Sequence, residues 1–170
     1  CQTGRRQAVM TRKKLIDRRL CVGCRNCELA CIAVHSSTRP GASYAAGVTG
    51  TERPRNKVEL DSQGNKFPQF CRHCDEPACV EACMSGALKK GDDGLVTCDH
   101  EICAGCFMCV MSCPYGMARP SVTHDRKMVK CDGCRGRETM ACVDACPQRC
   151  LKEIPDDGKP GGHLRMAEEK

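Results

Sequence analysis

The chain has 170 residues, of which only 3% are aromatic, and its formal net charge is +6. A core of large apolar side chains, each contributing roughly 2 kcal/mol on burial, is thinly supplied. The 19 cysteines indicate a scaffold of disulfides or metal instead. Secreted disulfide domains usually have an even number of irregularly spaced cysteines, whereas most of these lie two or three residues apart. That spacing favours a metal or redox centre in a reducing compartment.

The charged and apolar segments exclude further classes. No apolar run approaches the roughly 20 residues needed to cross a bilayer, and no apolar segment follows Arg5 and Arg6 as an export signal requires. We therefore expect a cytoplasmic protein without direct membrane insertion. Lys and Arg residues are scattered apart from an arm at residues 5–19, so the basic charge does not predict nucleic-acid binding.

The elements predicted from the sequence are all short. Strands are expected at residues 15–17, 87–88, 95–99 and 151–154, each beside a cysteine-rich loop. Turns are expected at residues 61–64 and 91–94, where Gly, Asp and Ser cluster. Helices of one or two turns are expected at residues 80–84, 110–112 and 143–145. The expected class is a small α+β fold.

Sixteen of the cysteines form four motifs, each ending in a three-residue spacer. They are Cys21-x2-Cys24-x2-Cys27-x3-Cys31, Cys71-x2-Cys74-x4-Cys79-x3-Cys83, Cys103-x2-Cys106-x2-Cys109-x3-Cys113 and Cys131-x2-Cys134-x7-Cys142-x3-Cys146. The third, followed by Pro114, matches the bacterial ferredoxin run that holds [4Fe–4S] clusters letter for letter.

This spacing has a physical reason. Three cysteines two residues apart form a tight loop that directs their thiolates at three irons of one cubane. The last spacer places the fourth cysteine on the next helical turn, so that it ligates the other cluster of a pair. The motifs must therefore work in twos, and the sequence predicts four [4Fe–4S] clusters. Zinc is the alternative for paired cysteines, but zinc knuckles do not need the third and fourth cysteines of these motifs.

Bound clusters would also change the charge of the protein. Each oxidised cluster with its four thiolates has a charge of about −2, so four of them would take the chain from +6 to about −2. The basic excess is then explained as compensation for buried anionic clusters.

The cysteine-rich strings resemble those of a known family. They are Cys21-Val-Gly-Cys-Arg-Asn-Cys-Glu-Leu-Ala-Cys31, Cys71-Arg-His-Cys-Asp-Glu-Pro-Ala-Cys79, Cys106-Phe-Met-Cys-Val-Met-Ser-Cys-Pro-Tyr-Gly116 and Lys130-Cys-Asp-Gly-Cys134. They look like the four-cluster ferredoxin-type subunits that pair with dimethyl-sulfoxide reductase, formate dehydrogenase, hydrogenases and carbon monoxide dehydrogenase. The resemblance covers roughly residues 14–154. It implies an electron carrier inside an oxidoreductase complex, with no substrate site of its own.

The resemblance also implies two interleaved ferredoxin-like 2[4Fe–4S] modules. Cluster I would be held by Cys21, Cys24, Cys27 and Cys146, cluster II by Cys31, Cys131, Cys134 and Cys142, cluster III by Cys71, Cys74, Cys79 and Cys113, and cluster IV by Cys83, Cys103, Cys106 and Cys109. Residues 14–35 and 121–154 would form the outer module and residues 65–120 the inner one. Residues 1–13 would then be an arm, residues 36–64 an insertion and residues 155–170 a tail.

Within the family, the compact length and the segment from Cys27 to Ser36 look most like the subunit that serves nickel carbon monoxide dehydrogenase. Single electrons would then pass between that enzyme and a second partner, such as a flavin-dependent NAD(P) oxidoreductase or a hydrogenase. The alternatives are the iron–sulfur subunit of a formate dehydrogenase, a hydrogenase or a molybdopterin oxidoreductase. An alternative of another class is a zinc-stabilised binding module.

Several residues remain outside the motifs. Cys98 and Cys150 are interpreted as small buried apolar residues, and Cys1 as part of a loose terminus. His73, inside a C-x2-C loop, is expected to donate a hydrogen bond near a cluster rather than bind iron. The other four histidines lack the paired spacing of a catalytic site. Residues 36–55 and the tail are candidate docking segments.

Overall fold

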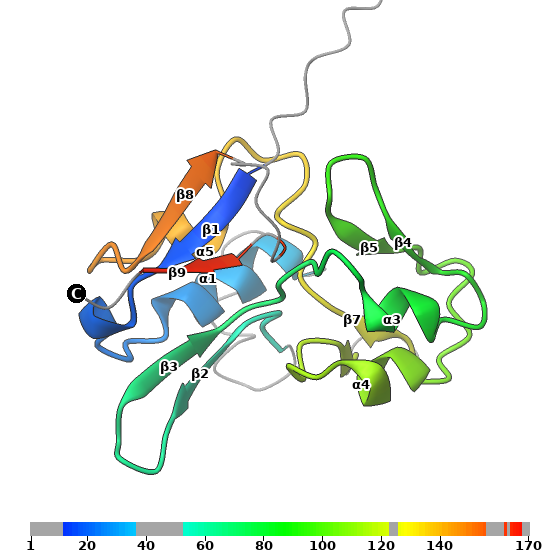
Figure 1. Cartoon of the computed structure of the whole chain (residues 1–170), viewed down its shortest axis with the longest axis horizontal. Helices are drawn as coiled ribbons and strands as arrows, with labels where there is room; N and C mark the ends of the chain where they lie inside the picture. Colours follow the sequence, from blue (N-terminus) through cyan, green and yellow to red (C-terminus); the bar gives the residue numbers. More distant parts are fainter. Residues whose placement is uncertain (1–11, 37–52, 123–125, 156–161, 163, 168–170) are drawn as a thin grey trace, which may run out of the picture.

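The computed structural model describes residues 12–36, 53–122, 126–155, 162 and 164–167. Its elements are short helices and strands, and in Figure 1 they gather on two sides of the molecule. The described strands form a three-stranded sheet with the order β8-β1-β9 and three two-stranded sheets, β2-β3, β4-β5 and β6-β7. The predicted α+β class is confirmed by this mixture.

The three-stranded sheet joins the two ends of the chain. Strand β1 (Arg12–Ile16) pairs antiparallel with β8 (Leu151–Pro155) and parallel with β9 (Leu164–Met166). Helix α1 (Asn26–His35) packs against α5 (Ala141–Asp144), so the first and fourth cysteine motifs meet beside this sheet. Figure 1 shows the blue β1 between the orange β8 and the red β9, with both helices behind.

The first hydrophobic core lies under this sheet and includes cysteines. Its buried members are Ile16, Cys27, Val58, Phe70, Met140, Cys142, Cys150, Leu151 and Leu164. The short 3-10 helix η1 (Arg18–Leu20) leads from β1 into the first motif. The hairpin of β2 (Lys57–Leu60) and β3 (Lys66–Gln69) supplies Val58 to the same core.

The middle of the chain builds a second, smaller core. Helix α3 (Ala78–Glu81) packs against α4 (Met108–Ser112), and the hairpin of β4 (Leu88–Lys90) and β5 (Val96–Cys98) lies beside them. Strands β6 (Arg119–Pro120) and β7 (Met128–Val129) complete this region. The buried residues are Leu88, Val96, Cys109, Ala118 and Met128.

Most of the predicted elements are confirmed, with shifted ends. The strands expected at residues 15–17, 87–88, 95–99 and 151–154 correspond to β1, β4, β5 and β8, and the three expected helices to α3, α4 and α5. Helix α1 contains the helical turn predicted for the three-residue spacer of the first motif, and at ten residues it is longer than the one or two turns expected. Strand β1 starts at Arg12, inside the arm expected at residues 1–13, and β9 lies inside the expected tail. Strand β1 pairs with β8 along one edge and with β9 along the other, and this pairing orders both terminal strands.

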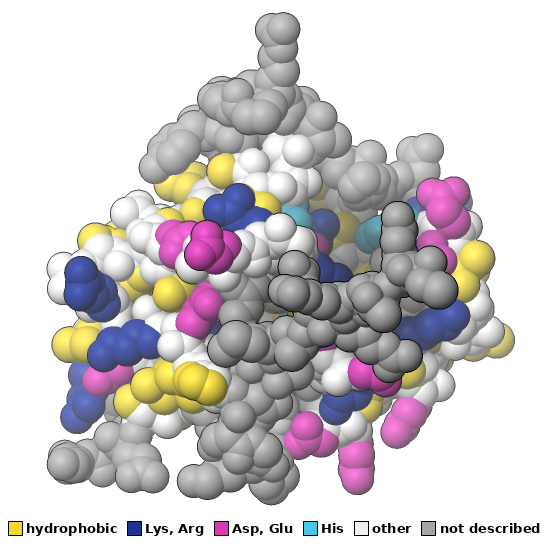
Figure 2. Space-filling view, turned by 90° about the horizontal axis from the view of Figure 1, so that it is seen from above, with side chains coloured by type: hydrophobic (Ala, Val, Ile, Leu, Met, Phe, Trp, Pro, Cys, Tyr) yellow, Lys and Arg dark blue, Asp and Glu magenta, His cyan; other side chains and the backbone are white. Residues whose placement is uncertain are grey.

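The surface shows no strong segregation of charge on the face drawn in Figure 2, where Lys, Arg, Asp and Glu side chains of the described residues are interspersed. None of the described helices is long and apolar enough to cross a bilayer. The docking segment expected at residues 36–55 falls mostly outside the described residues, as does Cys1.

The need for glycine in the backbone of the third motif can be tested by substitution. Gly105 and Gly116 both have positive φ, +66° and +60°, a conformation that costs other residues about 1–2 kcal/mol. A Cβ at position 105 would also collide with the main-chain oxygen of Arg126, whereas position 116 is open. Gly105→Ala is therefore expected to lower the temperature at which the loaded protein loses its visible absorbance by clearly more than Gly116→Ala. Equal losses would contradict this account of the loop.

Candidate iron–sulfur site

In the described part of the chain, the motif cysteines gather into four cages of thiols. One cavity is lined by Cys21, Cys24, Cys27 and Cys146, a second by Cys31, Cys131, Cys134 and Cys142, and a third by Cys83, Cys103, Cys106 and Cys109. In the remaining group, the thiol of Cys79 is an electrostatic neighbour of Cys71, Cys74 and Cys113. We call them cages I, II, IV and III after the clusters predicted for them. Each cage takes three cysteines from one motif and one from another.

The backbone of the cysteine loops explains how three thiols converge. In the first loop Gly23 and Arg25 have φ of +73° and +60°, and in the third Gly105 and Phe107 have +66° and +59°. These left-handed residues alternate with ordinary ones and curl the chain tightly around each cage. Because Arg25 and Phe107 immediately precede α1 and α4, the third cysteine of each motif falls on the first helical turn.

The fourth cysteine of a motif reaches another cage because of the helix. Cys27 and Cys31 lie one turn apart on α1, a rise of about 6 Å along the axis. Cys27 lines cage I and Cys31 lines cage II. The spacer was expected to send the fourth cysteine of a motif to a different cluster from the first three, and we call this the crossover. It has a direct geometric basis in this helix.

Each fourth cysteine also accepts a hydrogen bond from a main-chain N–H. Arg55 donates to Cys31 at 3.3 Å, and Leu88 and Met117 donate to Cys83 and Cys113 at 3.4 Å. The main-chain N–H of Leu151 bonds Cys146 in the same way. Such donors stabilise a thiolate, the form that binds iron.

The electrostatics of the cages fit a metal cluster. Burial raises the pKa of the Cys27 thiol to about 12 and those of Cys79 and Cys134 to about 11, and neighbouring cysteines add to the effect. Separate thiolates would repel one another in so small a space. Iron ligands must be deprotonated. A cofactor that brings positive iron to all four thiols compensates both the cost of burying the thiolates and their mutual repulsion.

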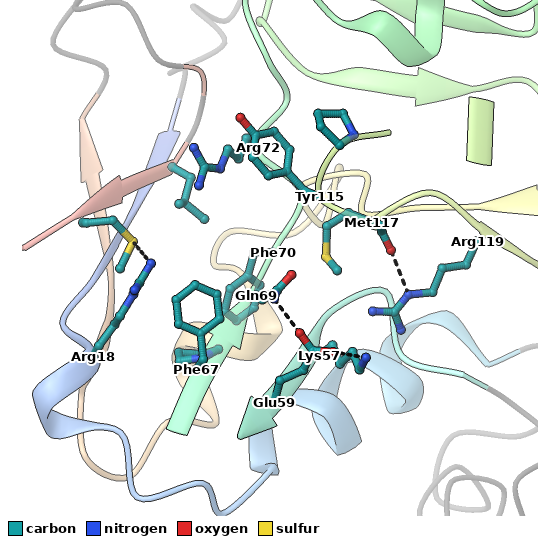
Figure 3. A pocket seen from close by; sticks show the side chains of 15 residues that line it. Arg18, Lys57, Glu59, Phe67, Gln69, Phe70, Arg72, Tyr115, Met117 and Arg119 are labelled. Carbon is teal, nitrogen blue, oxygen red and sulfur yellow. Dashed lines mark hydrogen bonds and ion pairs between the residues drawn. The ribbon is translucent and has the colours of Figure 1, made fainter. Parts of the chain in front are cut away.

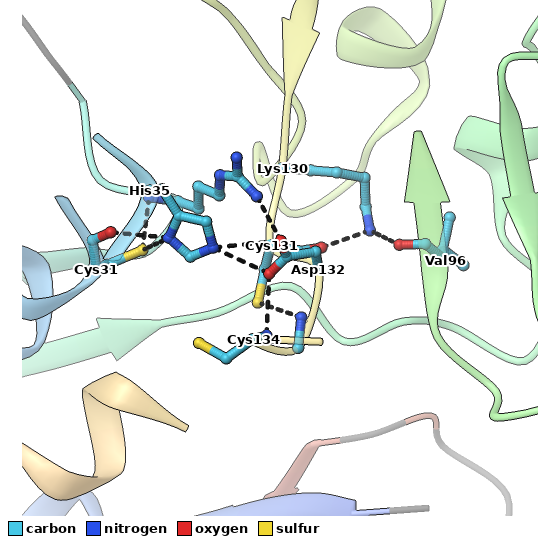
Figure 4. A network of polar contacts seen from close by, with 9 residues as sticks. Cys31, His35, Val96, Lys130, Cys131, Asp132 and Cys134 are labelled. Carbon is cyan, nitrogen blue, oxygen red and sulfur yellow. Dashed lines mark hydrogen bonds and ion pairs between the residues drawn. The ribbon is translucent and has the colours of Figure 1, made fainter. Parts of the chain in front are cut away.

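A polar network ties cage II to the end of α1 (Figure 4). His35 Nε2 lies 3.0 Å from a carboxylate oxygen of Asp132, and Arg55 Nη1 donates to the other oxygen at 2.8 Å. Asp132 also accepts the main-chain N–H of Cys134 at 2.9 Å. Burial alone would raise the pKa of Asp132, but His35 and Arg55 hold it well below its usual range. The carboxylate thus fastens the fourth motif to the first.

The sequence offered little signal for this network. His35 had no histidine partner at a useful spacing, and Arg55 lay in the expected insertion. Asp132 could have been singled out only by its place between Cys131 and Cys134. His73 accepts the main-chain N–H of Val96 at 2.9 Å with its Nδ1, so this nitrogen anchors β5. This contact leaves the expectation that the ring N–H donates near a cluster as a prediction.

Two of the cysteines outside the motifs lie beside cages. Cys150 is 5% exposed, and its Sγ is 3.3 Å from Sγ of Cys146 in cage I. Cys98, half-buried on β5, lines cage IV. They are therefore small residues at the cage walls, closer to the motif thiols than the sequence suggested.

A larger pocket, of about 450 Å3, lies beside the cages and shares Pro68 with the lining of cage I and Phe70 with that of cage II (Figure 3). The guanidinium of Arg18 stacks 3.7 Å from the ring centre of Phe67, and that of Arg72 lies 4.0 Å from the ring of Tyr115. Its walls are thus made of cation–aromatic pairs. The chemistry-bearing groups of the motifs lie in the smaller, cysteine-lined cavities.

Four thiol cages in a small α+β fold define an iron–sulfur protein of the ferredoxin type. The family model described as a 4Fe-4S dicluster domain matches residues 63–155, which contain the second to fourth motifs. The chain therefore belongs to the 4Fe-4S dicluster family, and the predicted [4Fe–4S] cofactor is confirmed.

Named relatives support the same family. The protein is 38% identical over 155 residues to one of the chains of the anaerobic dimethyl sulfoxide reductase of Escherichia coli, covering 84% of this chain and 72% of the relative. It is 33% identical over 144 residues to one of the subunits of the tetrathionate reductase of Salmonella typhimurium, covering 81% of this chain and 53% of the relative. Among solved structures, the BamBC active-site complex of benzoyl coenzyme A reductase has a similar fold, with a TM-score of 0.50, 22% identity, and coverage of 95% of this chain and 83% of that one.

These relatives bear on the partner expected from the sequence. They give no support to carbon monoxide dehydrogenase as the partner enzyme. They favour the alternative of an iron–sulfur subunit of another reductase, since the relatives at 38% and 33% identity are components of such enzymes.

The crossover between α1 and the fourth motif can be tested by substituting one ligand at a time. Cys31→Ser is expected to alter the same electron paramagnetic resonance signal as Cys131→Ser, because both thiols line cage II. Cys27→Ser, one helical turn away, is the matched control and should alter a different signal. The crossover is wrong if Cys27→Ser and Cys31→Ser change one and the same cluster.

The network of Asp132 predicts a cost for losing its charge. Asp132→Asn leaves the guanidinium of Arg55, whose side chain is 16% exposed, without its carboxylate. We expect a loss of about 1–3 kcal/mol of stability, measured as a lower denaturant concentration at which visible absorbance disappears. Asp92→Asn, on an exposed turn, is the control and should change stability by less than about 0.5 kcal/mol. Equal effects would show that the network adds nothing.

Proposed function

We propose that this chain is the electron-transfer subunit of a molybdopterin oxidoreductase, of the kind that reduces dimethyl sulfoxide or tetrathionate. The observation that carries the proposal is the set of four thiol cages, together with relatives that are named components of those two reductases. When bound, [4Fe–4S] clusters accept and release single electrons. The protein itself binds and separates them, and substrate chemistry takes place on the partner.

In this proposal the sixteen motif cysteines are the iron ligands in the sets predicted for clusters I to IV. The packing of α1 on α5 supports a module that holds clusters I and II, and the packing of α3 on α4 supports one that holds clusters III and IV. The two hydrophobic cores divide the chain similarly, except that Phe70 lies in the first core and Met128 in the second. The outer module takes its parts from both ends of the chain, and the inner one from the middle.

The contacts between cages support a single row. Cys27 of cage I is an electrostatic neighbour of Cys142 of cage II, and Cys71 is one of Cys131. Because Cys71 belongs to cage III and Cys131 to cage II, these two cages meet at the junction of the modules. Cys79 on α3 and Cys83, two residues beyond the end of that helix, then lead from cage III to cage IV. The order is I, II, III, IV.

The two ends of this row come close to the surface. Cys24 of cage I and Cys106 of cage IV are the exposed cysteines among those described. Exposed apolar side chains surround both ends: Leu20 and Val22 beside cage I, and Met84, Ile102, Met108 and Met111 beside cage IV. These two places suit protein partners that deliver and remove electrons, because a short distance to a cluster is needed at each.

The test of the proposed function is the metal content of the purified protein. We expect about sixteen irons and a matching amount of acid-labile sulfide per chain, with the brown colour of [4Fe–4S] clusters. The native complex, purified through a tag on this chain, should contain a large subunit with bound molybdopterin. A colourless protein with zinc would instead support the zinc-stabilised module and contradict the proposal. A co-purified partner that contains nickel and has carbon monoxide dehydrogenase activity would contradict the proposed partner and support the one expected from the sequence.

A further inference from the structure

A buried lysine lies in cage II. Lys14 on β1 is 4% exposed, and its Nζ lies 4.1 Å from the ring centre of Phe70. Its ammonium hydrogen-bonds the thiol of Cys142 and lines the cavity with the other cysteines of the cage. The buried ammonium therefore lies directly beside the cysteines proposed to hold cluster II.

A second buried lysine occupies the matching place at cage III. Lys130 is 5% exposed and donates to the main-chain oxygens of Val96 at 2.5 Å and Cys131 at 2.9 Å (Figure 4). Its ammonium also hydrogen-bonds the thiol of Cys71 and is an electrostatic neighbour of Cys79. Lys130 therefore sits where cages II and III meet.

Cages I and IV have a different environment. No charged side chain lines cage IV in the described part of the chain, and the one described charged residue that lines cage I, Arg25, is exposed. In place of a lysine, each has a neutral extra cysteine at its wall, Cys150 and Cys98. The other cation beside cage II, Arg55, is compensated by its ion pair with Asp132.

From this pattern we infer that Lys14 and Lys130 set the electron affinities along the row, by making clusters II and III easier to reduce than clusters I and IV. The inference rests on the proposed function, since it takes the four cages as cluster sites. Both lysines act through ligand thiolates and are therefore positioning residues for charge, not catalytic residues.

The charge of the clusters determines whether the lysines favour or disfavour their reduction. Reduction by one electron takes a cluster with its four thiolates from a charge of about −2 to about −3. A fixed ammonium stabilises the more negative state, and a buried one is poorly screened by solvent and salt. Hydrogen bonds to ligand sulfur act in the same direction. An electron that enters at either end of the row is therefore transferred to cluster II or III. These two clusters hold the first two electrons.

The experiment is a redox titration of the loaded full-length protein, followed by electron paramagnetic resonance. Lys14→Met removes the charge while keeping a long apolar side chain, and should disfavour reduction of one cluster at least tenfold, which is about 59 mV for one electron. Lys130→Met should shift a different cluster by a similar factor. Lys89→Met, on the exposed face of β4, is the matched control and should shift none. Iron and sulfide are counted in every sample.

The outcomes separate the inference from the proposed function. An iron count well below about sixteen in the unaltered protein contradicts the proposed function itself. A full iron count with unchanged potentials in both lysine variants, or an equal shift of all four clusters, overturns only the inference.

A second measurement avoids the buried substitutions, in case Lys14→Met fails to load iron. Cys24→Ser and Cys106→Ser alter the exposed ligands of cages I and IV and so identify the signals of those clusters. In the titration of the unaltered protein, the signals identified in this way should belong to the clusters that are reduced last. If they belong to the clusters reduced first, the inference is wrong.

Discussion

The fold depends on the convergence of thiols from distant segments of the chain. Each cage needs one cysteine from a second motif, and in cages I and II that cysteine comes from more than 90 residues away. The same cysteines are also core residues: Cys27 and Cys142 lie in the first hydrophobic core and Cys109 in the second. Cofactor binding and core formation are therefore one process, and metal binding energy contributes directly to folding. A protein so poor in aromatic residues has no independent core to retain its shape without the cages.

Main-chain and side-chain polar groups are distributed differently around the cages, and this difference is the basis for expecting different cluster potentials. Main-chain N–H groups reach the fourth cysteine of every motif, so they treat the four cages alike. The side chains do not. Buried ammonium groups of Lys14 and Lys130 serve the two inner cages, while neutral thiols serve the outer ones. The backbone thus supplies a common cradle, and a few side chains distinguish one cage from another.

Much of the fold could be predicted from cysteine spacing, because cluster geometry tightly restricts the backbone between ligands. The spacing located α3, α4, α5 and the strands beside them. It could not predict β9, whose pairing with β1 depends on a contact between the two ends of the chain. The spacing also predicted that the fourth cysteine lies one helical turn on and serves another cluster, as Cys27 and Cys31 do on α1, whereas the full sets of four were predicted only through the family resemblance.

The charged residues of the site were much harder to predict. Lys13 and Lys14 fell inside the basic arm at residues 5–19, and nothing in a run of basic residues shows that strand pairing on both sides will bury their side chains. Lys130 stood next to a motif but is buried through a contact with Val96, 34 residues earlier. Asp132 and Arg55 meet only after the first and fourth motifs have come together. Such residues depend on tertiary packing, which local patterns do not record.

The packing of α1 on α5 also has a consequence for biosynthesis. Cages III and IV take their cysteines from residues 71–113 alone, so this part of the chain can close around its cofactors as soon as that stretch has left the ribosome. Cages I and II need cysteines from residues 131–146, and the sheet that covers them needs β8 and β9. The first motif, although synthesised before all others, must therefore wait with open thiols until nearly the whole chain has been made.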